Sequence, residues 1–343
     1  MSIINSPLDL TPRDEFLFLK GFVPQCNVYM KLEGLQATGS IKVKSAIFIL
    51  DDLEQRGLAI PGKTTIVEST SGNMGIALSF LCRLRNYRFI CVTDPKVAST
   101  NKAGIEAYGG EVIIVDKRDK NGDYVGTRVE KVKELLAGNP DYVCTNQYSN
   151  PANKKAHATW TAEEILRNFK KVDYMFIGAG TTGTLMGIAE SFSKKSPDTK
   201  IIAVEPEGSV TFDDTRKGTR LIPGIGASQR PPLTDPSYVD QVIYVEEPDT
   251  IKACYRAAQQ YGMLFGGSTG SVMAAILSQA SVLKEGATVV AVSPDFGDRY
   301  MDTIYSPEWV IKNYGFDPRE TDYRPKEPLI PPLRDFIAKN KKD

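Results

Sequence analysis

The stretch VESTSGNMGIAL, residues 67–78, passes from an apolar run into a cluster of small hydrogen-bonding residues and then into a helical pattern. Backbone N–H groups in the first turn of a helix have no partner within the helix, and the peptide dipoles favour an anion there. Gly72 lets the backbone approach a ligand closely, and Thr70, Ser71 and Asn73 add side-chain donors. The stretch predicts either a site for a carboxylate or phosphate, or an ordinary capped turn.

The same strand-to-helix alternation continues along the chain from residue 64 onward. Short β-branched runs predict strands at 64–69, 88–93, 111–116, 142–147, 174–180, 200–206, 241–247 and 287–295. Helical patterns that follow most of these strands predict helices near 74–86, 99–109, 124–138, 156–169, 184–195, 248–261 and 271–283. Such alternation is typical of βαβ units and of mostly parallel sheets buried on both faces. The sequence therefore predicts an α/β fold, with two α/β layers and a ligand between them.

The length of the chain predicts more than one domain. With 343 residues it exceeds the usual size of a single hydrophobic core, so two domains that share a cleft are expected. The polar segment 206–236 is too long and irregular for a simple crossover, which makes it a candidate active-site loop. The last part of the chain is rich in proline and charge and predicts an extension rather than a further domain.

Composition argues against several classes of partner. The 42 basic and 42 acidic residues cancel and are interspersed, which gives no electrostatic footprint for nucleic acid or an anionic membrane. The five cysteines are scattered, as reduced thiols of a cytosolic protein would be, and no CxxC pair suggests a metal. The start lacks a signal-peptide pattern, and no apolar run reaches the roughly 18 residues of a membrane span. A soluble, cytoplasmic protein without a metal is predicted.

A second polar loop resembles the first. In IGAGTTGTLMG, residues 177–187, small and hydroxyl-bearing residues again lie where a strand becomes a helix: Gly180, Thr181, Thr182, Gly183 and Thr184. Backbone amides in such a turn suit a phosphate dianion. No lysine follows the glycines as in a Walker A loop, and a dinucleotide fingerprint lacks its ribose carboxylate. A phosphate-bearing cofactor other than a nucleotide fits better.

Two further features complete the pattern. In FGGSTGSVMAA, residues 265–275, small residues again precede a helix, and one neutral hydroxyl facing a ring nitrogen is as plausible as an anion site. In GLQATGSIKVKSAIF, residues 34–48, Lys42 lies in a small-residue turn that opens a helix. Most lysines are solvated surface charges, but an amine held in a cleft beside a phosphate site can have a lowered pKa and form a Schiff base with a carbonyl. Together these features describe a pyridoxal phosphate site.

An ordered set of motifs carries a family resemblance. TGSIK, ESTSGNMGIAL, NQYSNPAN, GAGTTGT, PGIGAS, GGSTGSV and PDFGDRY occur in the order and at roughly the spacing found in cysteine synthases and cystathionine β-synthases. The chain resembles this family over about residues 20–310. The resemblance implies pyridoxal phosphate fold-type II, similar to the tryptophan synthase β subunit: two α/β domains with mostly parallel sheets and the cofactor in the cleft. It also implies a homodimer.

The resemblance implies domain boundaries as well. The large cofactor-binding domain is expected to comprise residues 1–44 and 150–312, and the small mobile domain residues 45–149. Residues 313–343 form the C-terminal extension.

The resemblance also assigns roles to the residues of the cofactor site. Lys42 matches the lysine that holds the cofactor as a Schiff base and moves the proton at the substrate α-carbon. Asn73 matches the ligand of the cofactor 3′-oxygen, Gly180 through Thr184 the phosphate cup, and Ser268 the partner of the pyridine nitrogen. A neutral hydroxyl at that nitrogen favours elimination to an aminoacrylate over deeper carbanion chemistry.

The first loop is assigned to the substrate. Thr70, Ser71, Gly72 and Asn73, together with Gln147, resemble the binder of the substrate α-carboxylate.

Two positions depart from the family pattern. Val43 and Lys44 stand where members usually have Asp-Arg, which leaves the support of that helix open and makes Lys44 a competitor for the role of Lys42. Thr182 stands where many cysteine synthases have glycine.

Within the family, the motifs most resemble the N-(2-amino-2-carboxyethyl)-L-glutamate synthases, which supply the 2,3-diaminopropionate precursor of a siderophore. The expected reaction joins O-phospho-L-serine to L-glutamate and releases phosphate. A dianionic leaving group and a dicarboxylate nucleophile need cations, and Arg128 and Arg230 are the preferred candidates, with Arg220 and Lys96 also available. The alternatives are an O-acetylserine or O-phosphoserine sulfhydrylase and a catalytically silent binding protein that keeps the fold.

Overall fold

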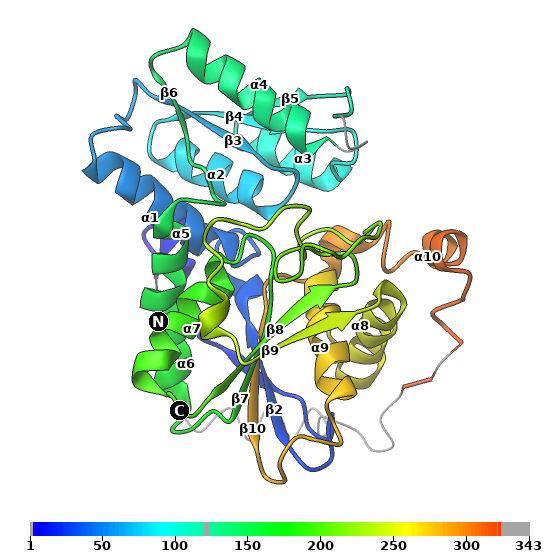
Figure 1. Ribbon diagram of the computed structural model, residues 1–343. Coiled ribbons are helices and arrows are strands. Elements are labelled where there is room, and N and C mark those ends of the chain that lie inside the picture. Colours follow the sequence, from blue (N-terminus) through cyan, green and yellow to red (C-terminus); the bar gives the residue numbers. More distant parts are fainter. Residues whose placement is uncertain (1–2, 120–123, 321, 324–343) are drawn as a thin grey trace.

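The computed structural model describes residues 3–119, 124–320 and 322–323. Its two sheets form two lobes, a smaller one above and a larger one below in Figure 1. The larger sheet has the strand order β1-β2-β10-β7-β8-β9 and the smaller one β5-β4-β3-β6. Every strand pair is parallel except β1 with β2. The predicted α/β class with mostly parallel sheets is therefore confirmed.

The larger sheet is buried on both faces by helices. Its strands are β1 (Phe16–Phe18), β2 (Asn27–Leu32), β7 (Tyr174–Gly178), β8 (Lys200–Pro206), β9 (Gln241–Val245) and β10 (Thr288–Ser293). Because side chains alternate along a strand, Met175 and Ile177 of β7 join the core beneath α7 (Gly183–Lys195). Phe176 points the other way and packs with α8 (Glu247–Tyr261) and α9 (Gly267–Ser278). This two-sided burial explains the continuous apolar runs in the sequence.

The smaller sheet is built in the same way from β3 (Thr65–Ser69), β4 (Arg88–Thr93), β5 (Glu111–Ile114) and β6 (Tyr142–Cys144). One face packs on α1 (Lys42–Gln55) and α2 (Asn73–Leu84), and α3 (Ser99–Ala107) contacts both α2 and β5. The other face packs on α4 (Val125–Gly138). Its strands all lie within residues 65–144, inside the range predicted for the small domain.

The helical segment predicted at 156–169 differs from the structure. It begins earlier, with α5 (Pro151–Ala156), and continues through the π-helix η3 (His157–Thr161) into α6 (Ala162–Asn168). The start is early because the Asn150 side chain accepts a hydrogen bond from the backbone N–H of Ala152 at 2.9 Å and Pro151 occupies the first turn. The last four residues of the NQYSNPAN motif therefore form the start of a helix.

The remaining elements lie near the ends of the chain. The alternation pattern missed β1 and β2, which precede it, and the short helix α10 (Pro307–Tyr314), which overlaps the start of the predicted extension. Of that extension, residue 321 and residues 324–343 lie outside the described residues. Short 3₁₀ turns occur at Pro7–Leu10, Glu33–Leu35, Pro236–Tyr238 and Gly297–Tyr300.

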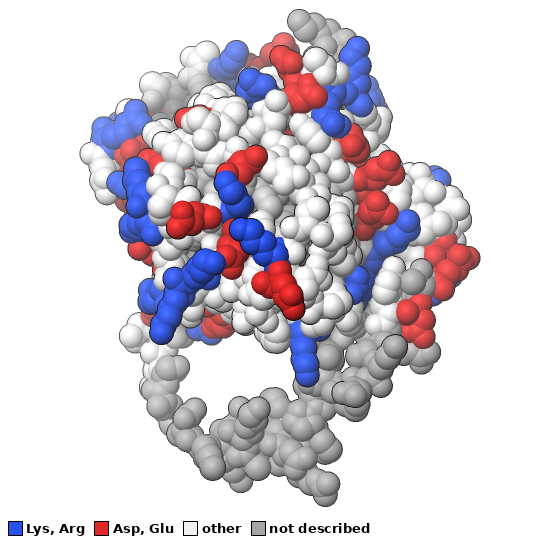
Figure 2. Space-filling model, turned by 60° about the horizontal axis from the view of Figure 1, so that its bottom comes forward, with Lys and Arg blue, Asp and Glu red and all other residues white. Residues whose placement is uncertain are grey.

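Surface charge and helix length agree with the composition. Figure 2 shows one face of the molecule on which basic and acidic side chains alternate rather than gather. Within the described ranges, no helix is both long and apolar enough to cross a bilayer. The described residues also contain no group of three or more His, Cys, Asp or Glu side chains suited to a metal.

Candidate active site

The predicted loops meet where the two lobes face each other (Figure 1). The stretch Thr70–Gly72 follows β3 in the smaller sheet, and Ala179–Thr182 follows β7 in the larger sheet. Both lie at the carboxyl ends of parallel strands, which is where ligands bind in open α/β sheets. The Asn73 side-chain nitrogen donates to Asp295 Oδ2 across the two lobes at 2.7 Å, which joins the loop after β3 to the PDFGDRY motif after β10.

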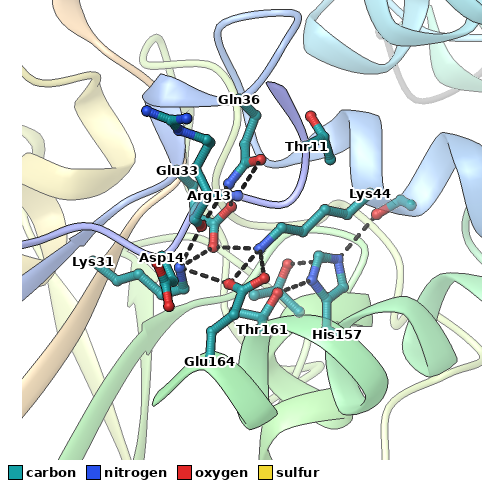
Figure 3. A network of polar contacts seen from close by, with 12 residues as sticks. Thr11, Arg13, Asp14, Lys31, Glu33, Gln36, Lys44, His157, Thr161 and Glu164 are labelled. Atoms are coloured by element: carbon teal, nitrogen blue, oxygen red, sulfur yellow. Dashed lines mark hydrogen bonds and ion pairs between the residues drawn. The ribbon is translucent and has the colours of Figure 1, made fainter. Parts of the chain in front are cut away.

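The structure separates Lys42 from its competitor Lys44. Lys44 is fully buried, and its amine lies between the carboxylates of Glu33 at 2.9 Å and Glu164 at 2.7 Å (Figure 3). Lys31 binds the same two carboxylates at 3.0 and 2.7 Å. An amine committed to two ion pairs is a poor nucleophile, so Lys44 supports the helix and does not compete with Lys42.

Lys42 has the properties that a Schiff-base lysine needs. It begins α1, is half-buried, and its amine has no hydrogen bond or ion pair to any other described residue. Burial lowers the pKa of Lys42, while the charge of Asp295 opposes that shift. A lowered pKa increases the fraction of neutral, nucleophilic amine.

The GTTGT loop forms a nest of free backbone donors. Across the described residues, none accepts a hydrogen bond from the backbone N–H groups of Gly180 to Leu185, and the start of α7 has no side-chain cap. Thr182 adopts a φ of 65°, rare for a β-branched residue, which explains why glycine is common there in the resembled family. Strained backbone of this kind clusters at ligand sites. The loop is therefore suited to a phosphate, and the assignment of Gly180 through Thr184 to the cofactor stays a prediction.

Asn153 of α5 holds the loop in place. Its side-chain nitrogen donates to the Gln147 carbonyl at 2.7 Å and to Thr181 Oγ1 at 3.2 Å. A Cβ on Gly183 would lie 2.4 Å from Asn153 Oδ1, so only glycine fits beside this buried amide. The segment 206–236 also contacts the GTTGT loop, since the backbone N–H of Gly226 donates to the Ala179 carbonyl just before that loop at 2.6 Å.

Gly183→Ala is expected to weaken cofactor binding about tenfold, because the displaced Asn153 amide would lose two hydrogen bonds worth about 1 kcal/mol or less each. The measurement is a titration of apoprotein with pyridoxal phosphate, followed by fluorescence. Gly138→Ala is the matched control, since a Cβ at this position, the end of α4, meets no atom within 4 Å. Equal affinities in both variants would contradict this account of the cup.

His157 connects α7, which follows the GTTGT loop, to α1, which begins at Lys42. Its Nε2 lies 3.0 Å from Ser45 Oγ on α1 and 3.2 Å from Thr184 Oγ1 on α7, and its Nδ1 lies 3.0 Å from Thr161 Oγ1. Burial and the charge of Lys42 lower the pKa of His157 well below its usual value. A neutral imidazole therefore couples the two helices. Sequence reasoning missed this histidine, because its partners Ser45 and Thr184 are distant in the chain.

Asn73, at the start of α2, is held in one orientation. Its nitrogen donates to Asp295, and its oxygen accepts from the Arg299 guanidinium. Asp295 also accepts from the Tyr300 hydroxyl at 2.7 Å, and burial raises the pKa of Asp295. One hydrogen of the amide nitrogen stays available for an oxygen acceptor such as that of the cofactor ring. Asp295 and Arg299 lie in the PDFGDRY motif, which sequence reasoning quoted without assigning roles.

The predicted carboxylate loop is joined to Gln147 by Glu68. The buried carboxylate of Glu68 accepts from the Ser69 backbone at 2.8 Å, from the Gln147 backbone at 3.2 Å and from the Thr145 hydroxyl. The backbone N–H groups of Ser71 and Asn73 donate to no described residue. The loop after β3 and the loop after β6 are thus brought together with free donors, as an anion site requires.

Ser268 begins α9 together with Thr269. Ser268 is buried, and no described residue is within hydrogen-bonding geometry of its hydroxyl. The neighbouring Thr269 hydroxyl is instead committed to Ser293 Oγ at 3.0 Å. Ser268 therefore keeps its hydroxyl for another partner, and its role at a ring nitrogen stays a prediction.

Arg128 and Arg230 are not gathered with these groups. Arg128 donates to Asp94 at 2.8 Å from the first turn of α4, and its buried Nε has no partner among the described residues. Arg230 is exposed and donates to the Thr211 carbonyl at 3.0 Å, within its own segment. Their predicted role toward the substrate stays a prediction.

The donor set as a whole fits pyridoxal phosphate. The free amides after β7 suit the phosphate, the unpaired amine of Lys42 suits the aldehyde, the Asn73 amide suits the ring oxygen, and the Ser268 hydroxyl suits the ring nitrogen. These are four different chemical groups of one molecule.

Comparisons with known proteins agree with this fit. The family model described as pyridoxal-phosphate dependent enzyme matches residues 13–295. The crystal structure of O-ureido-L-serine synthase is similar with a TM-score of 0.82 and 29% identity, over 98% of this chain and 100% of that chain. The crystal structure of a lysine-to-alanine mutant of O-ureido-L-serine synthase with O-ureido-L-serine bound is similar with a TM-score of 0.83 and 28% identity. This match covers 100% of both chains.

A hydrogen sulfide-producing enzyme from Fusobacterium nucleatum is also similar, with a TM-score of 0.80 and 31% identity over 87% of this chain and 100% of that one. These likenesses confirm the predicted fold-type II architecture. The chain belongs to the pyridoxal-phosphate dependent enzyme family, and pyridoxal phosphate is its cofactor.

Proposed function

We propose that this enzyme performs β-replacement on an activated serine. One observation carries the proposal: an unpaired, half-buried lysine amine, a nest of free amides after β7 and a loop with free amides after β3 lie where the two lobes face each other. When bound, pyridoxal phosphate supplies an electron sink that acidifies the substrate α-carbon and allows the β-substituent to leave.

The residues of the chain divide the remaining work. The Lys42 amine carries the cofactor and then accepts the α-proton, which its lowered pKa favours near neutral pH. The loop Thr70–Asn73 and Gln147 bind the substrate carboxylate through amides and hydroxyls. Because this loop opens a helix of the smaller lobe, substrate binding would draw the lobes together and exclude water from the reacting carbon.

The preferred reaction is O-phospho-L-serine plus L-glutamate. The glutamate nitrogen forms a bond to the serine β-carbon and loses a proton, the Cβ–O bond breaks, and phosphate leaves with the electron pair. The products are N-(2-amino-2-carboxyethyl)-L-glutamate and phosphate. The proposal is supported by the motif resemblance to the synthases that make this compound for a 2,3-diaminopropionate pathway. It is also supported by the many hydrogen-bond donors of the site that can bind an anion.

A sulfhydrylase making cysteine is the second candidate, since one similar protein is described as hydrogen sulfide-producing. Another similar protein is O-ureido-L-serine synthase, so a serine with a substituted β-oxygen is a third kind of product to examine. We further propose a cytoplasmic homodimer that acts on small amino acids and binds neither nucleic acid nor membranes.

Product analysis tests the reaction. Holoenzyme is incubated with O-phosphoserine or O-acetylserine, each offered with glutamate, with sulfide or with no nucleophile, and products are identified by mass spectrometry. We expect the glutamate adduct with phosphoserine, at a rate at least tenfold above that with acetylserine. Cysteine as the sole product from either donor would replace this proposal with the sulfhydrylase.

A further inference from the structure

A second cleft lies between the lobes, beside the candidate active site. Its volume is about 380 Å³, and its lining includes Thr38, Gly39, Asn101, Asp298 and Arg299. Thr38 and Gly39 precede Lys42 in the same loop, whereas Asn101 belongs to α3 of the smaller lobe. The cleft is therefore formed by both lobes next to the reacting centre.

Two residues that line this cleft each have a buried polar atom without a partner in the described part of the chain. Thr38 is 5% exposed, and its buried hydroxyl forms no hydrogen bond. The side-chain nitrogen of Asn101 donates to the Ser71 carbonyl at 3.1 Å, but its buried oxygen is unsatisfied. A buried polar atom without a partner costs about 1–3 kcal/mol, so a polar group that reached either atom from the cleft would lower that cost.

Arg299 adds a positive charge with spare donors. One terminal nitrogen donates to Asn73, the other donates to the Thr38 carbonyl at 2.6 Å, and Nε has no partner within the described part of the chain. A guanidinium has five N–H groups, so three remain for an anion such as a carboxylate. The exposed carboxylate of Asp298 next to it gives the cleft both signs of charge.

We propose that this cleft binds the second substrate, an amino acid nucleophile with a side-chain carboxylate, and that Arg299 selects that carboxylate. The inference rests on the proposed amine-accepting reaction. Arg299 fits this role better than Arg128 or Arg230, because it alone of the three lines the cleft and contacts Asn73. The opposite charges of Arg299 and Asp298 suit an amino acid, which carries both an ammonium and a carboxylate.

Binding is measured on holoenzyme whose cofactor has been fixed to its lysine by borohydride, so that glutamate cannot react with the cofactor through its own amine. L-glutamate is titrated calorimetrically into wild type, Arg299→Gln and Thr38→Val. We expect Kd to rise at least tenfold in Arg299→Gln and about threefold in Thr38→Val, as for one charged and one neutral hydrogen bond. Lys102→Gln is the control, since Lys102 lies on α3 but pairs with Glu106 on the surface at 2.7 Å.

Steady-state kinetics distinguish two roles of Arg299: binding the side-chain carboxylate of glutamate, and holding the side chain of Asn73. In Arg299→Gln the KM for glutamate should rise at least tenfold, and by more than the KM for phosphoserine, which changes through the lost contact with Asn73. Equal rises in both KM values would overturn the inference, as would unchanged glutamate binding in both variants. If Arg299→Gln loses its cofactor, Thr38→Val decides the matter, and wild-type glutamate affinity there overturns it.

Failure of the proposed reaction gives a different result. In that case wild-type enzyme itself neither forms the glutamate adduct nor binds glutamate, whatever the variants do. A wild type that forms the adduct beside an Arg299→Gln enzyme with unchanged glutamate KM overturns only the role of Arg299.

Discussion

Lys42→Ala is expected to lower the rate of β-replacement by at least about a thousandfold, because one amine serves as both cofactor anchor and proton acceptor. No described residue forms an ion pair with the Lys42 amine. Its loss therefore leaves no carboxylate without its partner, and the fold should survive. The measurement combines phosphate release from phosphoserine with the visible spectrum of the bound cofactor. Lys63→Ala removes an exposed lysine of the smaller lobe and should keep full activity.

Chemical labelling checks which lysine carries the cofactor. Reduction of the wild-type holoenzyme with borohydride, followed by peptide mapping, should find the pyridoxyl group on Lys42. Lys44 is enclosed by Glu33 and Glu164 and should stay unlabelled. Label on Lys44, or substantial activity in Lys42→Ala, would contradict the assignment.

Much of this site could be predicted because its signals are local. A strand, a turn of small residues and a helix start are consecutive in sequence, and the free amides that result are a property of that short segment. Lys42 could be chosen from its position in TGSIK. The structure adds the reason that Lys44 fails as a competitor, namely its two ion pairs.

The partners of these residues could not be predicted, because they come from distant parts of the chain. Asp295 lies 222 positions from the Asn73 that it orients, and Glu164 lies 120 positions from Lys44. No spacing rule reports such contacts. The early start of α5 is different: Asn150 and Pro151 form a recognisable helix start that the periodicity argument overlooked.

Lys44→Met is expected to lower the free energy of unfolding by about 3–5 kcal/mol, the usual cost of removing one partner from a buried ion pair. Two lysines and two glutamates, Lys31, Glu33, Lys44 and Glu164, balance each other with almost no exposure to solvent. The substitution would leave two buried carboxylates with one ammonium. Urea unfolding of the apoprotein, followed by circular dichroism, measures the change.

Two further variants separate uncompensated charge from lost packing. Lys195→Met removes a surface partner of Glu163 and should change the unfolding free energy by no more than about 1 kcal/mol. Lys44→Met combined with Glu164→Gln restores neutrality around Lys31 and Glu33, and should be more stable than Lys44→Met alone. A double variant that is no more stable than Lys44→Met alone would show that packing, not charge, is responsible.

The pH dependence of this network follows from its charges. Burial raises the pKa of Glu33, but Lys44 and Lys31 outweigh burial and lower it below the ordinary value of 4.5. Its contribution to stability is therefore present above pH 4.5 and is lost as the pH falls through the lower pKa of the folded state. In Lys44→Met the unpaired carboxylate should instead take up a proton more readily than in the unfolded chain. The stability difference between wild type and Lys44→Met should consequently shrink as the pH falls from 7 toward about 4, and a constant difference would contradict a charge origin.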